Sequence, residues 1–502
     1  MSSVKQLAGQ TMWYGVSSIA ARFLNYLLTP FLTYALTRAD YGKMSLVYSV
    51  LPVLNVLFTY GLETAFFRFS NKETDPKKIY NTTATSIIIS TFLFGIALLF
   101  FHKPLAALAG VGNYPELIRL SIYIIMLDTL SIIPFAKLRH DGRPKKYAMV
   151  KVAGILINIF FTFFFLLWCK NAVTKDPASF WSNFYSTAHN PVYYIVLANL
   201  IQATVTLLLL YKEVFTIRLK IDIPLWKQIM TYSSPLILVG LGGVINEVMD
   251  RQMLHKWVPG TATFKEEQVG IYSACYKLSI LITLFVQAFR MGAEPFFFKQ
   301  AGSQNQQRTY ARVMKFFVIV ICIMFLVVAL YLPIWKHFIA SKEWEGLAVV
   351  PILLLANMFL GIYYNLAIWY KLGHKTSAGA YITLTGVAIT IIINYFFIPY
   401  YSYMACAWAT FFCYGSMMVI SFIWGQKVFR IPYAWKKSVA FIVIAVLLFF
   451  VHKGITNLYS NNYFDTVLAT ILLLLYVRFI GFIEKKELPK LPVIGKYFTT
   501  TV

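Results

Sequence analysis

The chain has 502 residues, of which 59% are hydrophobic and only 13% are charged. A soluble domain carries about 25% charged residues, so this composition excludes an ordinary soluble fold. The formal net charge is +25. The basic residues lie in short segments between apolar runs and not on one soluble face, which argues against a nucleic-acid partner.

Apolar runs that are long enough to cross a lipid bilayer recur along the whole chain. A spanning helix needs about 20 apolar residues. The sequence therefore predicts an all-α polytopic membrane protein with about fourteen transmembrane helices and no sizeable soluble domain. The expected spans, in chain order, are roughly residues 11–36, 44–67, 81–101, 117–137, 147–169, 191–211, 228–254, 268–290, 313–334, 346–370, 378–398, 402–425, 437–452 and 465–483.

The N-terminal span is expected to be a retained helix. Lys5 is followed by an apolar stretch that continues to Leu36 without a small-residue cleavage site. A removed signal peptide has a shorter apolar region and ends at such a site.

The distribution of Lys and Arg among the loops predicts the orientation. The positive-inside rule places the basic loops on the cytoplasmic side, and an even number of spans places both termini there as well. The same charges would attract anionic membrane lipids. The basic loops are 68–78, 137–146, 212–227, 290–312, 427–437 and the tail 485–496.

Two segments of the chain share the pattern Gly-x-Glu-x-x-Phe-Phe-basic. They are 61–68 and 292–299, and each closes an even-numbered span, with an offset of 292 − 61 = 231 residues. Gly142 and Gly373 show the same offset, since 373 − 142 = 231. Offsets that agree across several matches are typical of an internal repeat.

A further pair supports the repeat, because Gly42 and Gly270 near the starts of the preceding helices differ by 270 − 42 = 228. We expect two pseudo-symmetric six-helix lobes of the same orientation, related by a half-turn about the membrane normal, with Glu63 placed on Glu294. The alternative is an old duplication retained for packing only. The expected lobes are residues 1–212 and 213–430, followed by two further helices and a cytoplasmic tail in 431–502. Parallel repeats are typical of transporters whose substrate site lies between the halves.

Catalytic, metal and nucleotide signatures are missing from the sequence. No Gly-x-x-x-x-Gly-Lys-Ser/Thr loop for ATP is found, and the histidines and cysteines do not have metal-ligand spacing. The longest expected external loop, 170–190, is too short for the catalytic machinery of a membrane glycosyltransferase. We therefore expect no enzyme activity, no catalytic residue, no metal and no cofactor.

Polar residues inside the expected spans fall on helical stripes. A charge at the bilayer centre costs about 2.5–3.5 kcal/mol, so it usually faces a cavity or a partner. Arg22 and Lys277 lie deepest. Interhelical hydrogen bonding is the alternative role for the uncharged members. The candidate cavity residues are Arg22, Asn25 and Thr29 in the first span, Asn55 and Thr59 in the second, Asn246, Asp250 and Arg251 in the seventh, and Tyr276, Lys277 and Gln287 in the eighth.

Four charged residues lie at the expected cytoplasmic ends of the second and eighth spans. They are Glu63 and Arg68 in one segment of the repeat, and Arg290 and Glu294 in the other. We expect them to form gate or lobe contacts, or ion pairs with one another.

Several of these segments resemble the polysaccharide transporter family, the O-antigen-type lipid-linked oligosaccharide flippases of the multidrug/oligosaccharidyl-lipid/polysaccharide exporter superfamily. The chain departs from many members at Tyr400, where they have glycine after Ile-Pro. The segments that carry the resemblance are 22–30, Tyr41-Gly42, Gly61-Leu62-Glu63, Val269 to Ser273 with Tyr276-Lys277-Leu278, Glu294-Pro295, and Asn394 with Ile398-Pro399, Ala405, Ala407, Ala409 and Thr410.

The resemblance implies a flippase of the bacterial inner membrane that works by alternating access, with a central cavity lined mainly by spans 1, 2, 7 and 8. The implied cargo is an undecaprenyl-diphosphate-linked oligosaccharide for surface polysaccharide biosynthesis. Arg22 and Lys277 would provide cations for the diphosphate. The implied partners are membrane lipids, H+ or Na+ as a coupling ion, and the polymerase and glycosyltransferases of the same pathway.

Three other functions remain open. A multidrug cation antiporter of the same superfamily would be expected to have an acidic cavity, whereas the deepest charges here are basic. A lipid-linked peptidoglycan precursor flippase would use the same mechanism on a different head group. A polysaccharide polymerase or ligase is disfavoured by the short external loops.

The orientation can be tested by cysteine labelling. Lys145 and Lys486 are expected to be cytoplasmic, and Lys175 and Asn461 external, because this arrangement places the basic majority inside. A membrane-impermeant thiol reagent added to intact cells should therefore label cysteines at positions 175 and 461 only. Labelling of position 145 in intact cells would contradict the orientation.

Overall fold

The computed structural model describes residues 19–20, 22–70, 75–300, 302–373, 375–458, 461–485 and 487. Every regular element in these ranges is helical. Thirteen helical segments in the described chain are long and apolar enough to cross a membrane. Residues 22–35 are also helical and belong to the expected first span, whose beginning lies outside the described residues. The prediction of an all-α polytopic membrane protein is confirmed.

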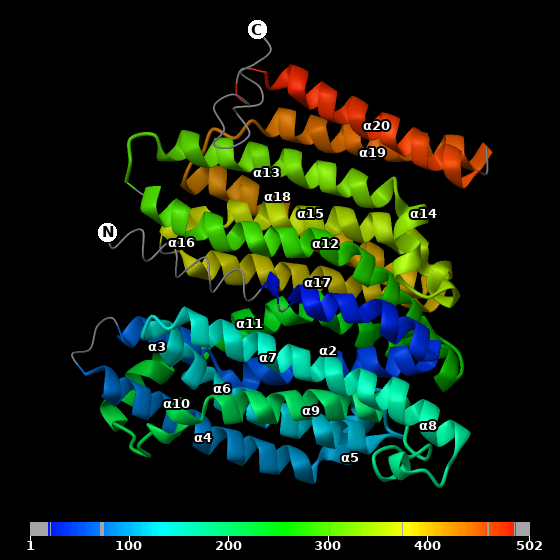
Figure 1. The fold of residues 1–502 in the computed structure, drawn as a ribbon. Helices are drawn as coiled ribbons and strands as arrows, with labels where there is room; N and C mark the ends of the chain where they lie inside the picture. The colour runs from blue at the N-terminus through cyan, green and yellow to red at the C-terminus, as the bar shows by residue number, and fades with distance from the viewer. Residues whose placement is uncertain are drawn as a thin grey trace.

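The helices run back and forth in one bundle (Figure 1). The first half of the chain contributes α2 (Arg38–Thr59), α3 (Leu62–Ser70), α4 (Pro76–Phe100), α5 (His102–Leu108), α6 (Pro115–His140), α7 (Pro144–Phe163), α8 (Lys170–Lys175), α9 (Pro191–Leu209) and α10 (Tyr211–Phe215). The second half contributes α11 (Ile223–Trp257), α12 (Ala262–Gln300), α13 (Gln306–Ala329), α14 (Leu332–Trp335), α15 (Val349–Leu366), α16 (Ile368–Leu372), α17 (Thr376–Tyr401), α18 (Tyr403–Val428), α19 (Trp435–Leu458) and α20 (Asn462–Ile483).

Prolines and short polar side chains fix where many of these helices begin. Five of the long helices (α4, α6, α7, α9 and α11) have a proline in the first turn, where its missing N–H group costs nothing. Asp75, Asn190 and Asp222 cap α4, α9 and α11 by accepting hydrogen bonds from backbone N–H groups. The helices α11 and α12, with 35 and 39 residues, continue past the apolar runs into polar sequence.

The bundle has two groups of helices, which we call the N-lobe (residues 22–35 and α2 to α10) and the C-lobe (α11 to α18). The N-lobe fills the lower half of Figure 1 and the C-lobe lies above it. Helix α11 contacts α2 and α3 of the N-lobe as well as α17 and α18 of the C-lobe. Helices α19 and α20 pack on each other and on α13, at the outer side of the C-lobe.

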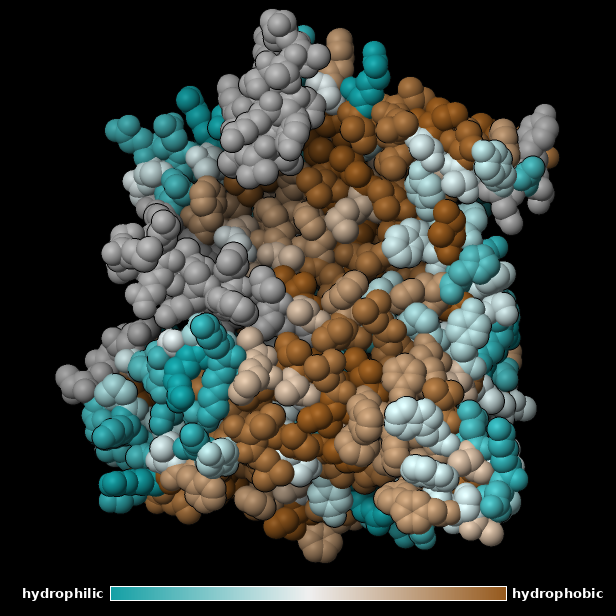
Figure 2. Space-filling view, in the orientation of Figure 1, coloured by the Kyte–Doolittle hydropathy of each residue, from teal (hydrophilic) through white to brown (hydrophobic). Residues whose placement is uncertain are grey.

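One end of the bundle, which we call the basic face, contains the ends of α3, α6, α9 and α12 and the starts of α4, α7, α11 and α13. It lies on the left of Figure 1 and corresponds to the loops expected in the cytoplasm. Hydrophobic side chains cover the middle of the visible surface, and hydrophilic ones gather at the two ends (Figure 2). This is the distribution expected for helices that cross a bilayer.

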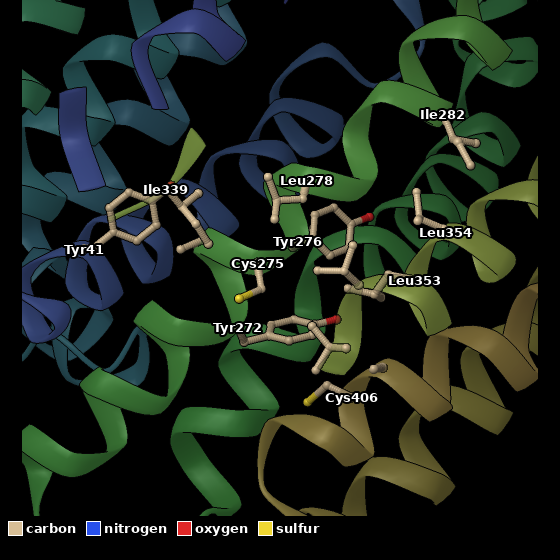
Figure 3. Packing of buried hydrophobic residues seen from close by; sticks show 14 of the residues in the cluster. Tyr41, Tyr272, Cys275, Tyr276, Leu278, Ile282, Ile339, Leu353, Leu354 and Cys406 are labelled. Atoms are coloured by element: carbon tan, nitrogen blue, oxygen red, sulfur yellow. The ribbon is translucent and has the colours of Figure 1, made fainter. Parts of the chain in front are cut away.

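The buried core is continuous between the lobes. One hydrophobic cluster contains Tyr41 of the N-lobe together with Tyr272, Cys275 and Tyr276 of α12 and Cys406 of α18. Figure 3 shows these side chains converging from three separately coloured parts of the chain. The cluster lies beside the closest approach of the two lobes.

The closest approach is between α2 and α12, and it depends on the glycines at the 228-residue offset. A Cβ atom at Gly42 would collide with the carbonyl oxygen of Glu266, and one at Gly270 would collide with the carbonyl oxygen of Arg38. Since 266 − 38 is also 228, each helix makes the same contact with the other. A two-fold axis between related helices produces such a mutual contact, which supports the expected repeat.

The two halves differ in structure at 61–68 and 292–299, the segments that share the Gly-x-Glu pattern. Tyr60 and Gly61 adopt positive φ angles of 33° and 74°, so the second span breaks into α2 and α3. Helix α12 runs through Gly292 without a break. The difference follows from packing, because Gly61 lies against Leu236 of α11, whereas no atom outside its own helix lies within 4 Å of a Cβ placed on Gly292.

The glycine contact generates a stability prediction. Gly42→Ala and Gly270→Ala should each lower the temperature of unfolding in detergent, because an added methyl group between packed backbones costs about 1–3 kcal/mol. Gly292→Ala is the matched control, because Gly292 lies in α12 together with Gly270. It should leave stability unchanged or raise it, because alanine exceeds glycine in helix propensity by about 1 kcal/mol. Equal effects of all three changes would contradict the close contact.

Candidate functional site

A polar cavity of about 590 Å³ lies inside the N-lobe. Its walls come from five membrane helices, namely the helix at 22–35, α2, α6, α7 and α9. Polar and charged side chains make up much of its lining, which is unusual for the interior of a membrane bundle. These polar and charged residues are Arg22, Asn25, Tyr48, Asn55, Asp128, Ser131, Tyr147, Lys151, Asn199, Gln202 and Thr206.

Arg22 lies in this cavity, as do Asn25 and Asn55. The Arg22 side chain is exposed and forms no hydrogen bond or ion pair with the described residues. A guanidinium group in this position has all its donors available. It can bind a phosphate group through two parallel hydrogen bonds.

Two other residues predicted in the first two spans lie elsewhere. Thr29 is 2% exposed and does not line the cavity. The Thr59 hydroxyl donates to the carbonyl oxygen of Asn55 at 2.7 Å, which is a bond within its own helix. The polar stripe of the first span therefore divides between a cavity-facing part and a buried part.

Asp128 and Lys151 are cavity residues that the sequence interpretation missed. Asp128 is exposed, and the surface that it faces is the cavity. The Lys151 Nζ atom lies 4.2 Å from the centre of the Phe135 ring. The two opposite charges interact electrostatically but do not form a close ion pair within the described chain. Each of the two charged residues lies inside a long apolar run, so the sequence alone could have identified both as candidate cavity residues.

In the C-lobe, Asp250 and Arg251 form an ion pair with each other. The guanidinium of Arg251 donates to Asp250 at 2.9 Å, and the Tyr272 hydroxyl also donates to Asp250. The Arg251 guanidinium lies 4.6 Å from the centre of the Tyr276 ring. This cluster on α11 and α12 holds a charge pair beside the lobe contact.

Lys277 follows this cluster on α12. It is half-buried and forms no hydrogen bond or ion pair in the described part of the chain. The positive charge of Arg251 acts on it, and the two repel each other. Gln287, which lies ten residues after Lys277 on α12, is also half-buried. Lys277 is thus a second cation inside the bundle whose charge is not neutralised by a described partner.

Asn246 has a structural role in the C-lobe. It is 5% exposed, and its side-chain amide donates to the carbonyl oxygen of Thr383 at 3.2 Å. Thr390 donates to its side-chain oxygen at 3.4 Å, and Tyr414 donates to its backbone carbonyl at 3.2 Å. These contacts join α11 to α17 and α18, as interhelical hydrogen bonds do in membrane bundles.

The charged residues near the basic face form separate contacts. Glu63 pairs with Arg139 of α6 and not with Arg68. Arg68 lies over the Tyr232 ring at 4.1 Å and so joins α3 to α11, while Arg290 lies over the Tyr364 ring at 4.8 Å. The side chain of Glu294 lies outside the described residues.

The lobes are tied together at the end opposite the basic face. The Arg38 guanidinium donates to the carbonyl oxygen of Lys342 and pairs with Glu345 at 3.3 Å. Lys43 of α2 pairs with Glu266 of α12 at 3.5 Å. Glu343 is fully buried at this contact, and its carboxylate oxygens have no hydrogen-bond partner among the described residues.

The polar interior and the two lobes can now be compared with known proteins. A family model described as "Polysaccharide biosynthesis protein" matches residues 7–301, more than half of the chain. The chain belongs to this family. No curated protein sequence matches it.

Solved structures share the fold of this chain. The lipid II flippase MurJ in an inward closed conformation superposes with a TM-score of 0.71 at 13% identity, over 95% of this chain and 99% of that one. An inward-facing multidrug resistance MATE family transporter of the MOP superfamily gives 0.61 at 11% identity, over 85% and 98%. An outward-facing MATE family transporter gives 0.58 at 13% identity, over 84% and 95%. These likenesses show that the chain shares its fold with MurJ and MATE family transporters.

The interaction between the two cavity charges can be tested by a double-mutant cycle. Asp128→Asn or Lys151→Gln alone leaves the other charge without its counterion, so each should lower the temperature of unfolding. The double variant should regain most of the loss, with a coupling of about 0.5–3 kcal/mol.

The control cycle combines Asp128→Asn with Lys453→Gln, on the exposed surface of α19. Its effects should add. Additivity in the Asp128 and Lys151 cycle as well would show that the two charges do not interact.

Proposed function

We propose that this protein is a flippase that moves an undecaprenyl-diphosphate-linked oligosaccharide across the inner membrane by alternating access, for surface polysaccharide biosynthesis. The observation that carries the proposal is the pair Arg22 and Lys277, two intramembrane cations on helices of different lobes and without described partners. Membership of a polysaccharide biosynthesis family supports the glycan cargo.

The chemistry of the cargo explains why such cations are needed. A diphosphate group carries negative charge that must leave water during transfer, and Arg22 can offer it a bidentate guanidinium while Lys277 acts as a point charge. The other polar residues of the N-lobe cavity, such as Asn25, Asn55 and Gln202, supply hydrogen-bonding groups for sugars. Tyr276, Asp250 and Arg251 are proposed to position the C-lobe side of the site.

Transport requires that the lobes exchange contacts. The lobe contact through Gly42, Gly270, Arg38 and Lys43 lies opposite the basic face. If the basic face is cytoplasmic, this contact closes the external side. We propose that the repeats 1–212 and 213–430 rock about this contact, that 431–502 is an appendix, and that Glu63, Arg68, Arg290 and Glu294 act at the cytoplasmic opening.

The proposal includes the surroundings of the protein. We place it in the inner membrane, in contact with membrane lipids and with both termini cytoplasmic. In the proposed pathway, glycosyltransferases assemble the lipid-linked oligosaccharide, this protein moves it across the membrane, and a polymerase then uses it. Since the sequence has no ATP-binding loop, the driving force is proposed to be an H+ or Na+ gradient or the consumption of product.

The second candidate is a multidrug cation antiporter, and specific residues favour it. Asp128 faces the cavity and Glu247 is exposed on α11, so the interior also offers negative charge. A peptidoglycan precursor flippase has the same charge requirement as the first proposal. Transport of a radiolabelled lipid-linked glycan, of an organic cation and of lipid II by the same reconstituted protein would separate the three.

The proposed role of Arg22 predicts a specific loss of transport. Arg22→Ala should abolish transport per folded molecule, and Arg22→Lys should restore only part of it because the bidentate fork is lost. Lys277→Ala should be harmful but less so. Glycan export, divided by the amount of folded protein in the membrane, is the measurement.

Arg119→Ala removes an exposed arginine at the start of α6 and serves as the control. It should leave transport unchanged. Full activity per folded molecule in the Arg22→Ala protein would remove Arg22 from the site and would reduce its role to folding.

A further inference from the structure

A second large hollow lies outside the proposed transport route, at the basic face of the N-lobe. It has a volume of about 900 Å³ and lies between the starts of α4 and α11, the end of α6 and the segment 215–222 that links the lobes. We call it the basic groove. Its charged lining residues are Asp75, Lys77, Lys78, Lys137, His140, Asp141, Arg218, Lys220 and Asp222.

The carboxylates of the basic groove are already engaged. Asp75 accepts from the backbone N–H of Lys77 at 2.9 Å and caps α4. Asp222 pairs with Lys78 at 3.0 Å and caps α11, and the N–H of Leu225 together with Lys78 holds the pKa of Asp222 below its usual range. Asp141 lies 3.4 Å from His140. Each carboxylate is held by another group, and the four lysines and one arginine of the lining outnumber the three carboxylates.

Three of those cations have no side-chain partner among the described residues, namely Lys77, Arg218 and Lys220. A fourth, Lys137, is held in place, because its Nζ donates to the Thr216 hydroxyl at 3.0 Å and lies 4.4 Å from the centre of the Tyr80 ring. The groove thus presents positive charge that the described residues do not neutralise. Anions are the ligands that such a site binds.

The segment that carries Arg218 and Lys220 is fixed against α4. The N–H of Arg218 donates to the Asn81 side chain at 2.9 Å, and its carbonyl oxygen accepts from the Thr85 hydroxyl at 3.4 Å. The N–H of Asp222 donates to the Thr82 hydroxyl at 3.2 Å. The backbone is therefore ordered before any ligand arrives, which lowers the entropic cost of binding.

The rim of the groove includes Phe215, whose surface is 85% exposed. Leu219 and Ile223, with 70% and 53% of their surfaces exposed, do not line the groove but lie beside its cations in sequence. Exposed apolar side chains next to basic ones are typical of a segment at the membrane interface. A free anion in water would gain nothing from this rim, whereas the acyl chains of a lipid would cover it.

We infer that the basic groove binds the phosphate headgroup of an anionic phospholipid, with the acyl chains on Phe215, Leu219 and Ile223 and the phosphate near Lys77, Arg218 and Lys220. Because the segment 215–222 links the two lobes, a bound lipid would hold the linker against the N-lobe. The inference does not depend on the cargo that the protein moves.

Thermal unfolding of the purified full-length protein in detergent tests the inference. Short-chain phosphatidylglycerol should raise the unfolding temperature by several degrees, because a ligand that binds only the folded state stabilises it. Matched phosphatidylcholine should not. Arg218→Gln with Lys220→Gln should raise the apparent Kd for phosphatidylglycerol at least fivefold, and added salt should weaken binding.

The control is Lys145→Gln with Lys227→Gln, which removes two exposed lysines from the basic face outside the groove. It should retain the wild-type response to phosphatidylglycerol. Lys77→Gln is a second groove variant, used if the double variant unfolds without lipid. An equal response to phosphatidylcholine, or equal losses in the groove and control variants, would overturn the site. An equal shift with inorganic phosphate would overturn the lipid assignment in favour of a free anion.

Discussion

The contact between α2 and α12 determines how the two halves of this protein meet. Only glycine at positions 42 and 270 lets the backbones approach, because a methyl group on either would collide with a carbonyl oxygen of the other helix. In membranes, where lipid is as apolar as the side chains, such close packing is a main source of helix association. Arg38 and Lys43 extend the contact with bonds to the C-lobe.

The placement of charge follows from the same environment. Lipid cannot solvate a charge, so the charges inside the bundle either pair, as Asp250 and Arg251 do, or face a hollow, as Arg22 and Asp128 do. Lys277 is the exception, because it has no partner among the described residues and does not line the N-lobe cavity; for this reason it enters the proposed site together with Arg22. The fold alone would suit several cargoes, since MurJ and MATE transporters share it.

The two hollows of the N-lobe differ in depth and in charge balance. The inner cavity holds both signs, since Asp128 lines it together with Arg22 and Lys151, whereas the basic groove at the surface has more cations than carboxylates, and Lys77, Arg218 and Lys220 have no side-chain partner among the described residues. One arrangement suits a cargo that must enter and leave. The other suits a lipid that stays and fixes the linker between the lobes.

The sequence by itself determined the class of protein, the helices and the repeat signal, because long apolar runs and glycine offsets are local properties of the chain. It also identified Arg22, Asn25 and Asn55, which lie on the cavity. Tertiary structure decided the rest. Helical periodicity predicts which face of a helix a residue lies on, but not which other helix packs against that face. It could therefore not show that Thr29 and Asn246 are buried, or that Glu63 pairs with Arg139. Asp128 and Lys151, on helices far from Arg22 in sequence, line the same cavity as Arg22 only because the bundle folds around it.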